Sequence, residues 1–324
     1  MRAALVEQFG APESLVVRTV PDPVPGPGEV LIDVAAAGMN YPDGLVVAGT
    51  YQILPDLPFT PGKEVSGTIL EAGPGVSRLK AGDRVLAQIE AGGYAERVTT
   101  AENLVVLIPD AIDFDTAAAF GLGYVTAHFA LIRRAGLRRG ETVLVTGAGG
   151  SVGSAAVQLA KAFGAVVVAV AENAERAALA HEQGADHVLE ADPAKLRDAV
   201  RAVTDGKGAD VVLELVGGEL FSQALRATAW EGRVVAIGFA SGDLPVVKVG
   251  HLLVKNIGVM GLQVSVYRDK EPDVFRQTLE EMLDLAVSGA LQVPVEAVVP
   301  LTQAGEALGR VMNGTVRGKL VLKP

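Results

Sequence analysis

Cysteine is absent from all 324 residues of this chain, and only four histidines are present. The lack of cysteine excludes disulfides, iron–sulfur clusters, cysteine nucleophiles and thiolate zinc sites. The four histidines are scattered along the chain, which argues against a histidine-rich metal site. They are His128, His181, His187 and His251. We therefore expect chemistry that uses neither a thiol nor a bound metal.

Long apolar runs and an excess of positive charge are also lacking. The longest purely apolar run, residues 165–171, is far shorter than the roughly 18–20 residues that cross a membrane. Glu7 lies where an N-terminal export signal would have its apolar core, so no such signal is expected. The net charge of −10 argues against a nucleic-acid partner, which needs a basic face. These absences predict a cytoplasmic protein without a membrane or nucleic-acid partner.

The first 120 residues are rich in proline, glycine and short β-branched runs. Residues 21–27 contain four prolines, which lack the amide donor that a helix or a central strand requires. Short strands are predicted at 29–34, 65–70, 83–87 and 95–98, separated by Gly- and Pro-containing turns. This pattern indicates a compact, mostly antiparallel β domain.

From about residue 118, apolar strands alternate with helical patterns. Strands without polar alternation are buried on both faces, which is typical of a parallel sheet covered by helices. Six of them with helical crossovers predict a doubly wound nucleotide-binding sheet. The segments 293–300 and 319–322 return to the character of the first domain, so the sheet domain is predicted to be inserted into a β-rich one. The predicted strands of the sheet domain are 142–146, 166–170, 187–189, 210–215, 233–237 and 258–262.

The strongest motif is the glycine-rich segment 146–153, Thr-Gly-Ala-Gly-Gly-Ser-Val-Gly, between a predicted strand and a predicted helix. Ala148, Gly150 and Gly153 occupy the small-residue positions of the dinucleotide fingerprint, where the backbone can approach a pyrophosphate. A turn needed only for tight strand–helix packing is the alternative. The flanking strand and helix favour a dinucleotide site.

The choice of nicotinamide cofactor depends on the residues after the second strand of this domain. An acid there binds the ribose hydroxyls of NAD, whereas a cation binds the 2′-phosphate of NADP. Glu172 is the candidate acid and Arg176 the candidate cation, and either residue could equally be a solvated helix residue. Because Ala171 fills the last strand position, we favour NADP(H), with NAD(H) as the alternative.

Further short motifs are spread along the whole chain, at 40–43, 49–51, 58–64, 82–85, 92–96, 126–127, 140–145, 156–161, 184–186, 217–218, 232–233, 238–239 and 318–322. Through these motifs the whole chain resembles the quinone oxidoreductase (zeta-crystallin-like) branch of the medium-chain dehydrogenase/reductase superfamily. The resemblance implies a six-stranded Rossmann-type domain, residues 122–262, inserted into a GroES-like catalytic domain, residues 1–121 and 263–324. Zinc enzymes of this superfamily have Gly-His-Glu where this chain has Gly62-Lys63-Glu64, so a zinc-independent enzyme is implied.

The resemblance also implies roles for individual residues. For catalysis it points to Tyr51, whose hydroxyl faces the substrate cleft, and to Asn40 and Asp43, which border the nicotinamide. Arg176 stands where the family usually has a lysine for the 2′-phosphate, while Glu172 departs from a frequent serine. The implied cofactor-binding residues are Asn40, Tyr41, Thr126, Gly150, Ser151, Val152, Gly153, Arg176, Gly238, Phe239 and Arg317.

The function predicted on this basis is an NADPH-dependent reductase of quinones or α,β-unsaturated carbonyls. Without a metal, the developing oxygen anion needs hydrogen-bond donors, and Tyr51 and Asn40 are the candidates. The alternative interpretations are that Tyr51 only fills a gap in its loop and that Asp43 only caps a turn. Glu64 is expected to be a structural acid with internal hydrogen bonds, because a buried unpaired carboxylate is costly. Alternative functions are an enoyl-thioester reductase, or a cofactor-binding or RNA-binding protein without turnover.

A homodimer is the last expectation from the sequence. The apolar strand 258–262 is the sixth of its sheet, and an uncovered edge would expose unpaired amides and carbonyls. Relatives in this branch commonly join their sheets at this edge, so the resemblance also implies a two-fold symmetric dimer.

Overall fold

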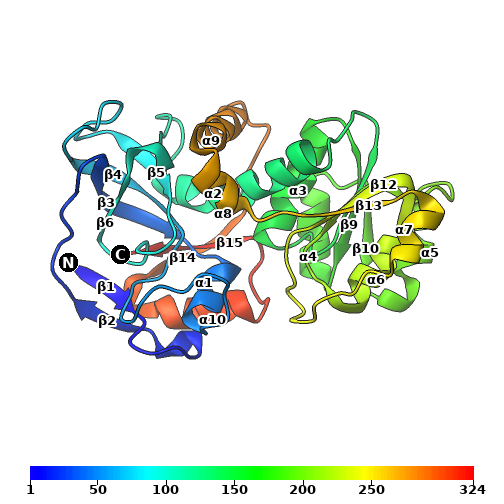
Figure 1. Cartoon of the computed structure of the whole chain (residues 1–324), viewed down its shortest axis with the longest axis horizontal. Coiled ribbons are helices and arrows are strands. Elements are labelled where there is room, and N and C mark those ends of the chain that lie inside the picture. Colours follow the sequence, from blue (N-terminus) through cyan, green and yellow to red (C-terminus); the bar gives the residue numbers. More distant parts are fainter. The chain divides into compact units, whose positions relative to one another are not determined.

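The computed structural model describes all residues, 1–324, and divides into two compact units. Unit 1 consists of Met1–Leu122 and Tyr267–Pro324, and unit 2 of Gly123–Val266. The colours of Figure 1 show that both ends of the chain build unit 1, while the middle builds unit 2. No helix has both the length and the hydrophobicity that crossing a membrane requires.

Unit 2 contains a six-stranded sheet in the order β10-β9-β8-β11-β12-β13, in which every pairing is parallel. This confirms the predicted doubly wound sheet, with its strand order reversing beside β8. Its strands are β8 (Thr142–Val145), β9 (Val166–Ala171), β10 (His187–Glu190), β11 (Ala209–Glu214), β12 (Thr228–Ala236) and β13 (Gly258–Gly261).

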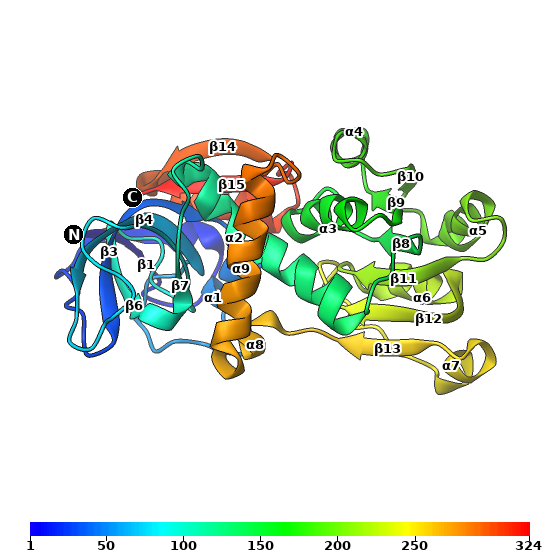
Figure 2. The ribbon, with the colours of Figure 1, turned by 90° about the horizontal axis from the view of Figure 1, so that it is seen from above.

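Helices cover both faces of this sheet. Figure 2 shows α3 and α4 on one face and α5 and α6 on the other. Leu144, Val168, Val212 and Val234 are fully buried beneath α5 and α6, which explains why these strands show no polar alternation. The helices are α3 (Ser151–Ala162), α4 (Ala174–Glu182), α5 (Pro193–Val203), α6 (Gly218–Ala227) and α7 (Val249–Lys255); α2 (Phe114–His128) continues as a π-helical turn, Phe129–Arg134.

Unit 1 contains a seven-stranded sheet in the order β14-β15-β3-β4-β5-β7, with β6 paired to β3. All its pairings are antiparallel except that of β14 with β15, so the predicted β-rich character is confirmed. Its strands are β3 (Glu29–Gly38), β4 (Glu64–Ala72), β5 (Arg84–Gln88), β6 (Arg97–Ala101), β7 (Val105–Leu107), β14 (Val295–Pro300) and β15 (Lys319–Lys323); β1 (Arg2–Leu5) and β2 (Val16–Thr19) form a separate antiparallel pair.

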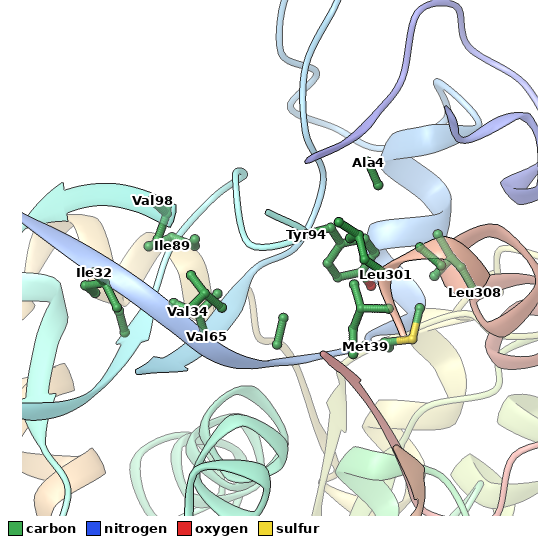
Figure 3. Packing of buried hydrophobic residues seen from close by; sticks show 14 of the residues in the cluster. Ala4, Ile32, Val34, Met39, Val65, Ile89, Tyr94, Val98, Leu301 and Leu308 are labelled. Atoms are coloured by element: carbon green, nitrogen blue, oxygen red, sulfur yellow. The ribbon is translucent and has the colours of Figure 1, made fainter. Parts of the chain in front are cut away.

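The core of unit 1 brings the two ends of the chain together. Figure 3 shows Ile32 and Val34 of β3 on one side of this core, and Met39, Tyr94 and Leu308 on the other. The remaining helices of unit 1 are α1 (Tyr41–Val47), α8 (Val264–Lys270, which begins at the end of unit 2), α9 (Pro272–Val287) and α10 (Ala304–Met312); short 3-10 turns lie at Pro12–Ser14, Glu102–Leu104 and Leu301–Gln303.

Candidate active site

The glycine-rich turn of unit 2 joins β8 to α3. Gly147 has φ +62, a conformation that favours glycine, and Gly150 is the residue before the first turn of α3. A Cβ on Gly153 would collide with the carbonyl oxygen of Gly147 and lie 2.8 Å from Ala148 Cα. The turn and the helix are therefore packed as closely as their backbones allow. The first-turn amides of α3, including those of Ser151 and Val152, form the kind of cradle that a pyrophosphate occupies.

Arg176 packs across this turn. A Cβ on Gly149 would lie 2.8 Å from Arg176 Cδ and closer still to its Cβ and Cγ. Arg176 Nη1 donates to Glu172 Oε2 at 3.1 Å, and the arginine side chain is 15% exposed while that of Glu172 is 40% exposed. The candidate cation and the candidate acid thus form an ion pair with each other. A bound 2′-phosphate would compete with Glu172 for the guanidinium.

Glu214, for which the sequence pattern predicted no role, fixes the carboxyl end of β11. This buried carboxylate accepts hydrogen bonds from Thr146 Oγ1 at 3.0 Å and from the amides of Val216 and Gly217 at 3.1 and 2.9 Å. Burial is the largest influence on Glu214 and raises its pKa. An acid at the last position of this strand, directly after the apolar residues 211–213, was the available sequence signal. Glu214 ties β11 to Thr146, at the start of the glycine-rich turn.

Three further predicted cofactor residues lie near these elements of unit 2. Gly238 follows β12, and its amide donates to the Glu214 carbonyl at 3.4 Å. The ring of Phe239 would be 3.3 Å from a Cβ on Gly217. Thr126 is buried on α2, the helix whose Gly123 packs so closely on α3 that a Cβ would lie 2.7 Å from Ser151 Oγ.

In unit 1, Asn40 belongs to a fully buried polar cluster with Glu64 and Lys319. Asn40 Nδ2 donates to Glu64 Oε1 at 2.9 Å and to the Gly38 carbonyl at 3.2 Å, while Lys319 Nζ donates to Asn40 Oδ1 at 2.5 Å. Lys319 also forms an ion pair with Glu64, which accepts further hydrogen bonds from Gln88 Nε2 and the Leu122 amide. The expectation that Glu64 is an internally bonded acid is confirmed. Both amide hydrogens of Asn40 are therefore donated within the protein, and the side chain connects Glu64, Lys319 and the Gly38 carbonyl.

Asp43 lies in the first turn of α1 and is buried. Asp43 Oδ2 accepts hydrogen bonds from the Asn40 amide at 2.8 Å and from Tyr94 Oη at 2.9 Å, whereas Oδ1 has no partner. Burial raises the pKa of Asp43 to about 6, against the opposing influence of the Lys63 charge. Its hydrogen bond to the Asn40 amide is the capping contact that the alternative interpretation expected. Tyr41 begins the same helix.

Tyr51 lies beside a charged cluster of unit 1. Lys63 Nζ is 4.7 Å from the centre of the Tyr51 ring, a cation–π contact, and forms an ion pair with Glu90. Arg268 Nη2 donates to the other oxygen of Glu90 at 3.1 Å. Burial, and then the negative charges of Glu90 and Asp43, raise the pKa of Tyr51, so its hydroxyl is protonated at neutral pH. The hydroxyl is a hydrogen-bond donor in this state.

Arg317 lies in the loop before β15, where its amide donates to Glu296. Three residues of these polar clusters had no role predicted from the sequence, namely Lys63, Lys319 and Glu214. No group of three or more His, Asp or Glu side chains is placed to hold a metal ion.

The pKa of Asp43 leads to a testable pH dependence. In the unfolded chain an aspartate has a pKa near 3.9, so the raised value means that ionisation of Asp43 opposes folding. Relative to Asp43→Asn, the wild type should lose about 2 kcal/mol of unfolding free energy as the pH rises from about 4 to above 6. Denaturant titrations at several pH values measure this difference. The exposed Asp198→Asn variant is the control, and an equal pH slope in wild type and Asp43→Asn would contradict the assignment.

Comparison with known proteins agrees with this architecture. Residues 26–110 match the alcohol dehydrogenase GroES-like domain family, and residues 151–288 match the zinc-binding dehydrogenase family. Quinone oxidoreductase-like protein 2 of Rattus norvegicus is 38% identical over 322 residues, which are 99% of this chain and 91% of that protein.

Two solved structures extend the comparison. A mycobacterial protein in complex with NADPH has a TM-score of 0.94 and 32% identity, and the match covers 100% of both chains. Quinone oxidoreductase of Escherichia coli in complex with NADPH has a TM-score of 0.92 and 28% identity, again over 100% of both chains. The chain is therefore an oxidoreductase of the quinone oxidoreductase branch of the medium-chain dehydrogenase/reductase superfamily.

Proposed function

We propose that this enzyme is an NADPH-dependent, zinc-independent reductase of quinones or α,β-unsaturated carbonyls. The observation that carries the proposal is the position of Arg176, which lies across Gly149 of the glycine-rich turn with its stem packed on the backbone. A cation beside a pyrophosphate-binding turn suits the 2′-phosphate of NADP. The NADPH complexes of the two similar structures support the same cofactor.

NADPH supplies a hydride when it is bound, and the residues of unit 2 would hold it. The first-turn amides of α3 would donate to the pyrophosphate, and Arg176 would bind the 2′-phosphate. Glu214 positions the turn through Thr146. Gly153 keeps α3 close enough for its amides to reach the same anion.

The residues of unit 1 would act on the substrate. Tyr51, kept protonated by burial and by Glu90, is the proposed donor to the carbonyl oxygen that gains negative charge. Lys63 occupies the position of the superfamily's zinc-binding histidine and places a fixed positive charge against the Tyr51 ring. Asn40 and Asp43 are proposed as positioning residues, because their polar atoms bind Glu64, Lys319 and Tyr94.

A steady-state panel tests this function directly. Quinones, enones and enoyl-thioesters should be assayed with NADPH and with NADH, with and without a chelator. The proposal requires turnover of a quinone or enone with NADPH that survives chelation. A strict preference for enoyl-thioesters would favour the alternative reductase, and a strict preference for NADH would contradict the cofactor assignment.

Arg176→Ala is expected to weaken NADPH binding by roughly 1–3 kcal/mol, the range for a hydrogen bond to a charged group. NADH binding should change little, because NADH lacks the 2′-phosphate. Arg176→Lys should keep most of the preference, and Glu172→Gln should strengthen NADPH binding by removing the competing carboxylate. Isothermal titration calorimetry gives the dissociation constants. Equal losses for both cofactors in Arg176→Ala would show that the arginine only supports the turn.

The enzyme is also proposed to be a homodimer joined at β13. This strand is at the edge of its sheet, and the preceding segment exposes Leu253 and Val254 by 78% and 80%. Val254→Glu should raise the dimer dissociation constant at least tenfold, because it places a charge in an apolar interface. Sedimentation velocity at micromolar concentration measures the effect. Val24→Glu, at an 81% exposed valine of unit 1, is the matched control, and a monomeric wild type would end the proposal.

A further inference from the structure

A polar pocket lies in unit 2, away from the glycine-rich turn. Its volume is about 180 Å³, and two arginines, two lysines and a tryptophan line it together with Gly206 and Ala227. Four of these side chains come from the last turns of α5, α6 and α7 and from the start of β12, and Lys207 comes from the loop before β11. Both ribbon views place these helix ends and the start of β12 at one end of unit 2 (Figures 1 and 2). The five side chains are Arg201, Lys207, Arg226, Trp230 and Lys255.

The topology separates this pocket from the cofactor site. Lys207 precedes β11, Arg226 precedes β12 and Lys255 precedes β13, so the pocket lies at the amino ends of three parallel strands. The glycine-rich turn follows the carboxyl end of β8 in the same sheet. The two sites therefore lie at opposite ends of the parallel strands.

The positive charges of the pocket have no carboxylate partner, although the chain as a whole carries −10. Lys255 Nζ donates to the carbonyl oxygens of Arg226 and Thr228 at 2.7 and 2.8 Å, and Arg201 Nε donates to the Gly206 carbonyl at 3.3 Å. Neutral carbonyls thus hold two of the cations in place without cancelling their charge. Asp205 and Glu231, which lie close to pocket residues in the sequence, form no ion pair with them.

Helix-end electrostatics explain only part of this arrangement. Arg201, Arg226 and Lys255 lie in the last turns of α5, α6 and α7, where cations stabilise the helix dipole. However, the side chains of Arg226 and Lys207 donate no hydrogen bond within the chain, so all of their donors remain available to a ligand. Burial, followed by repulsion from Arg201, Arg197 and Arg226, lowers the pKa of Lys255. A bound anion would relieve this repulsion.

Trp230 adds an aromatic surface to the pocket. Its side chain is 65% exposed, which is unusual for so large an apolar group, and it lies in the same lining as the four cations. We propose that this pocket binds a phosphate monoester that carries an aromatic ring, as a mononucleotide does. The cavity accommodates the phosphate among the arginine and lysine donors, and the ring stacks on Trp230 at the rim.

The chain provides its own reporter for this site, because Trp230 is its only tryptophan. Titration of the full-length protein with AMP should change the tryptophan emission and saturate at millimolar concentration or below. Adenosine should give at least a tenfold weaker response, and inorganic phosphate should compete with AMP. Arg226→Gln and Lys207→Gln should each weaken AMP binding at least tenfold, the loss expected for one charge-assisted hydrogen bond.

Matched variants separate this site from general charge effects and from the cofactor site. Arg18→Gln removes the same charge in unit 1, and Arg176→Ala alters the cofactor site; both should leave the AMP response unchanged. No emission change with AMP up to about 10 mM would overturn the proposal, since the site would then be too weak to count as specific. An equal response to adenosine, or equal losses in Arg18→Gln and Arg226→Gln, would also overturn it. Thermal unfolding of each variant establishes that its fold is intact.

Discussion

Replacing Lys319 by methionine is expected to cost the protein about 3–5 kcal/mol of unfolding free energy, the cost of leaving a buried charge without its partner. The Lys319 side chain is 2% exposed and that of its partner Glu64 is 0% exposed. The variant would leave the Glu64 carboxylate buried with only neutral donors around it, namely Asn40, Gln88 and the Leu122 amide. Chemical denaturation followed by circular dichroism measures the loss.

Two further variants identify the cause of this loss. Lys80→Met removes a lysine that is 82% exposed and paired with Asp83, and should change stability by no more than about 0.5 kcal/mol. The double variant Lys319→Met/Glu64→Gln should recover part of the loss, because it removes the uncompensated charge. If the double variant were less stable than Lys319→Met alone, packing rather than charge would account for the effect.

The architecture of unit 2 could be predicted because its signals are local. Apolar strands such as 166–170 coincide with β9, Val166–Ala171, to within a residue, and the glycine-rich turn marks the boundary of α3. These patterns depend on burial and on helix geometry, which the sequence expresses over a few residues.

Unit 1 was harder to predict, because its helices depend on tertiary contacts. The α1 helix begins with Tyr41 and Pro42, and proline is tolerated there because the first helical turn needs no amide donor. The α10 helix contains Gly305 and Gly309, which weaken a helical prediction. A Cβ on Gly305 would lie 2.8 Å from the Pro12 carbonyl, so packing against the chain's beginning requires the glycine.

The candidate site, too, could be predicted only where its signals are local in the sequence. The glycine-rich turn follows β8, and Arg176 lies in the first turn of α4 after the neighbouring strand β9, so two successive strand–helix connections were enough to predict both for one site. Lys319 and Asn40, in contrast, are 279 residues apart, and nothing in either local pattern indicates their hydrogen bond. Asn40 was predicted as a substrate donor; its amide hydrogens instead bind Glu64 and Gly38, which makes a positioning role the better proposal.

Gly153→Ala is expected to weaken NADPH binding roughly 100-fold or more and to lower the melting temperature as well. The added Cβ would collide with the Gly147 carbonyl and lie 2.8 Å from Ala148 Cα, and both of these are backbone atoms that no rotamer change can move. Either the turn or the first turn of α3 must shift, at the cost of about 1–3 kcal/mol that overpacking brings. That shift would also misalign the amides proposed to bind the pyrophosphate.

Gly150→Ala separates the loss of binding from damage to the fold. A Cβ on Gly150 would meet only the Gly147 carbonyl, at 3.5 Å, and the residue has an ordinary φ of −86. This variant should therefore melt within a few degrees of the wild type. Its NADPH affinity should still fall, because the methyl group occupies space that the proposed pyrophosphate needs. Calorimetric titration and thermal unfolding of the two variants give both quantities, and unchanged NADPH affinity in both would place the cofactor elsewhere.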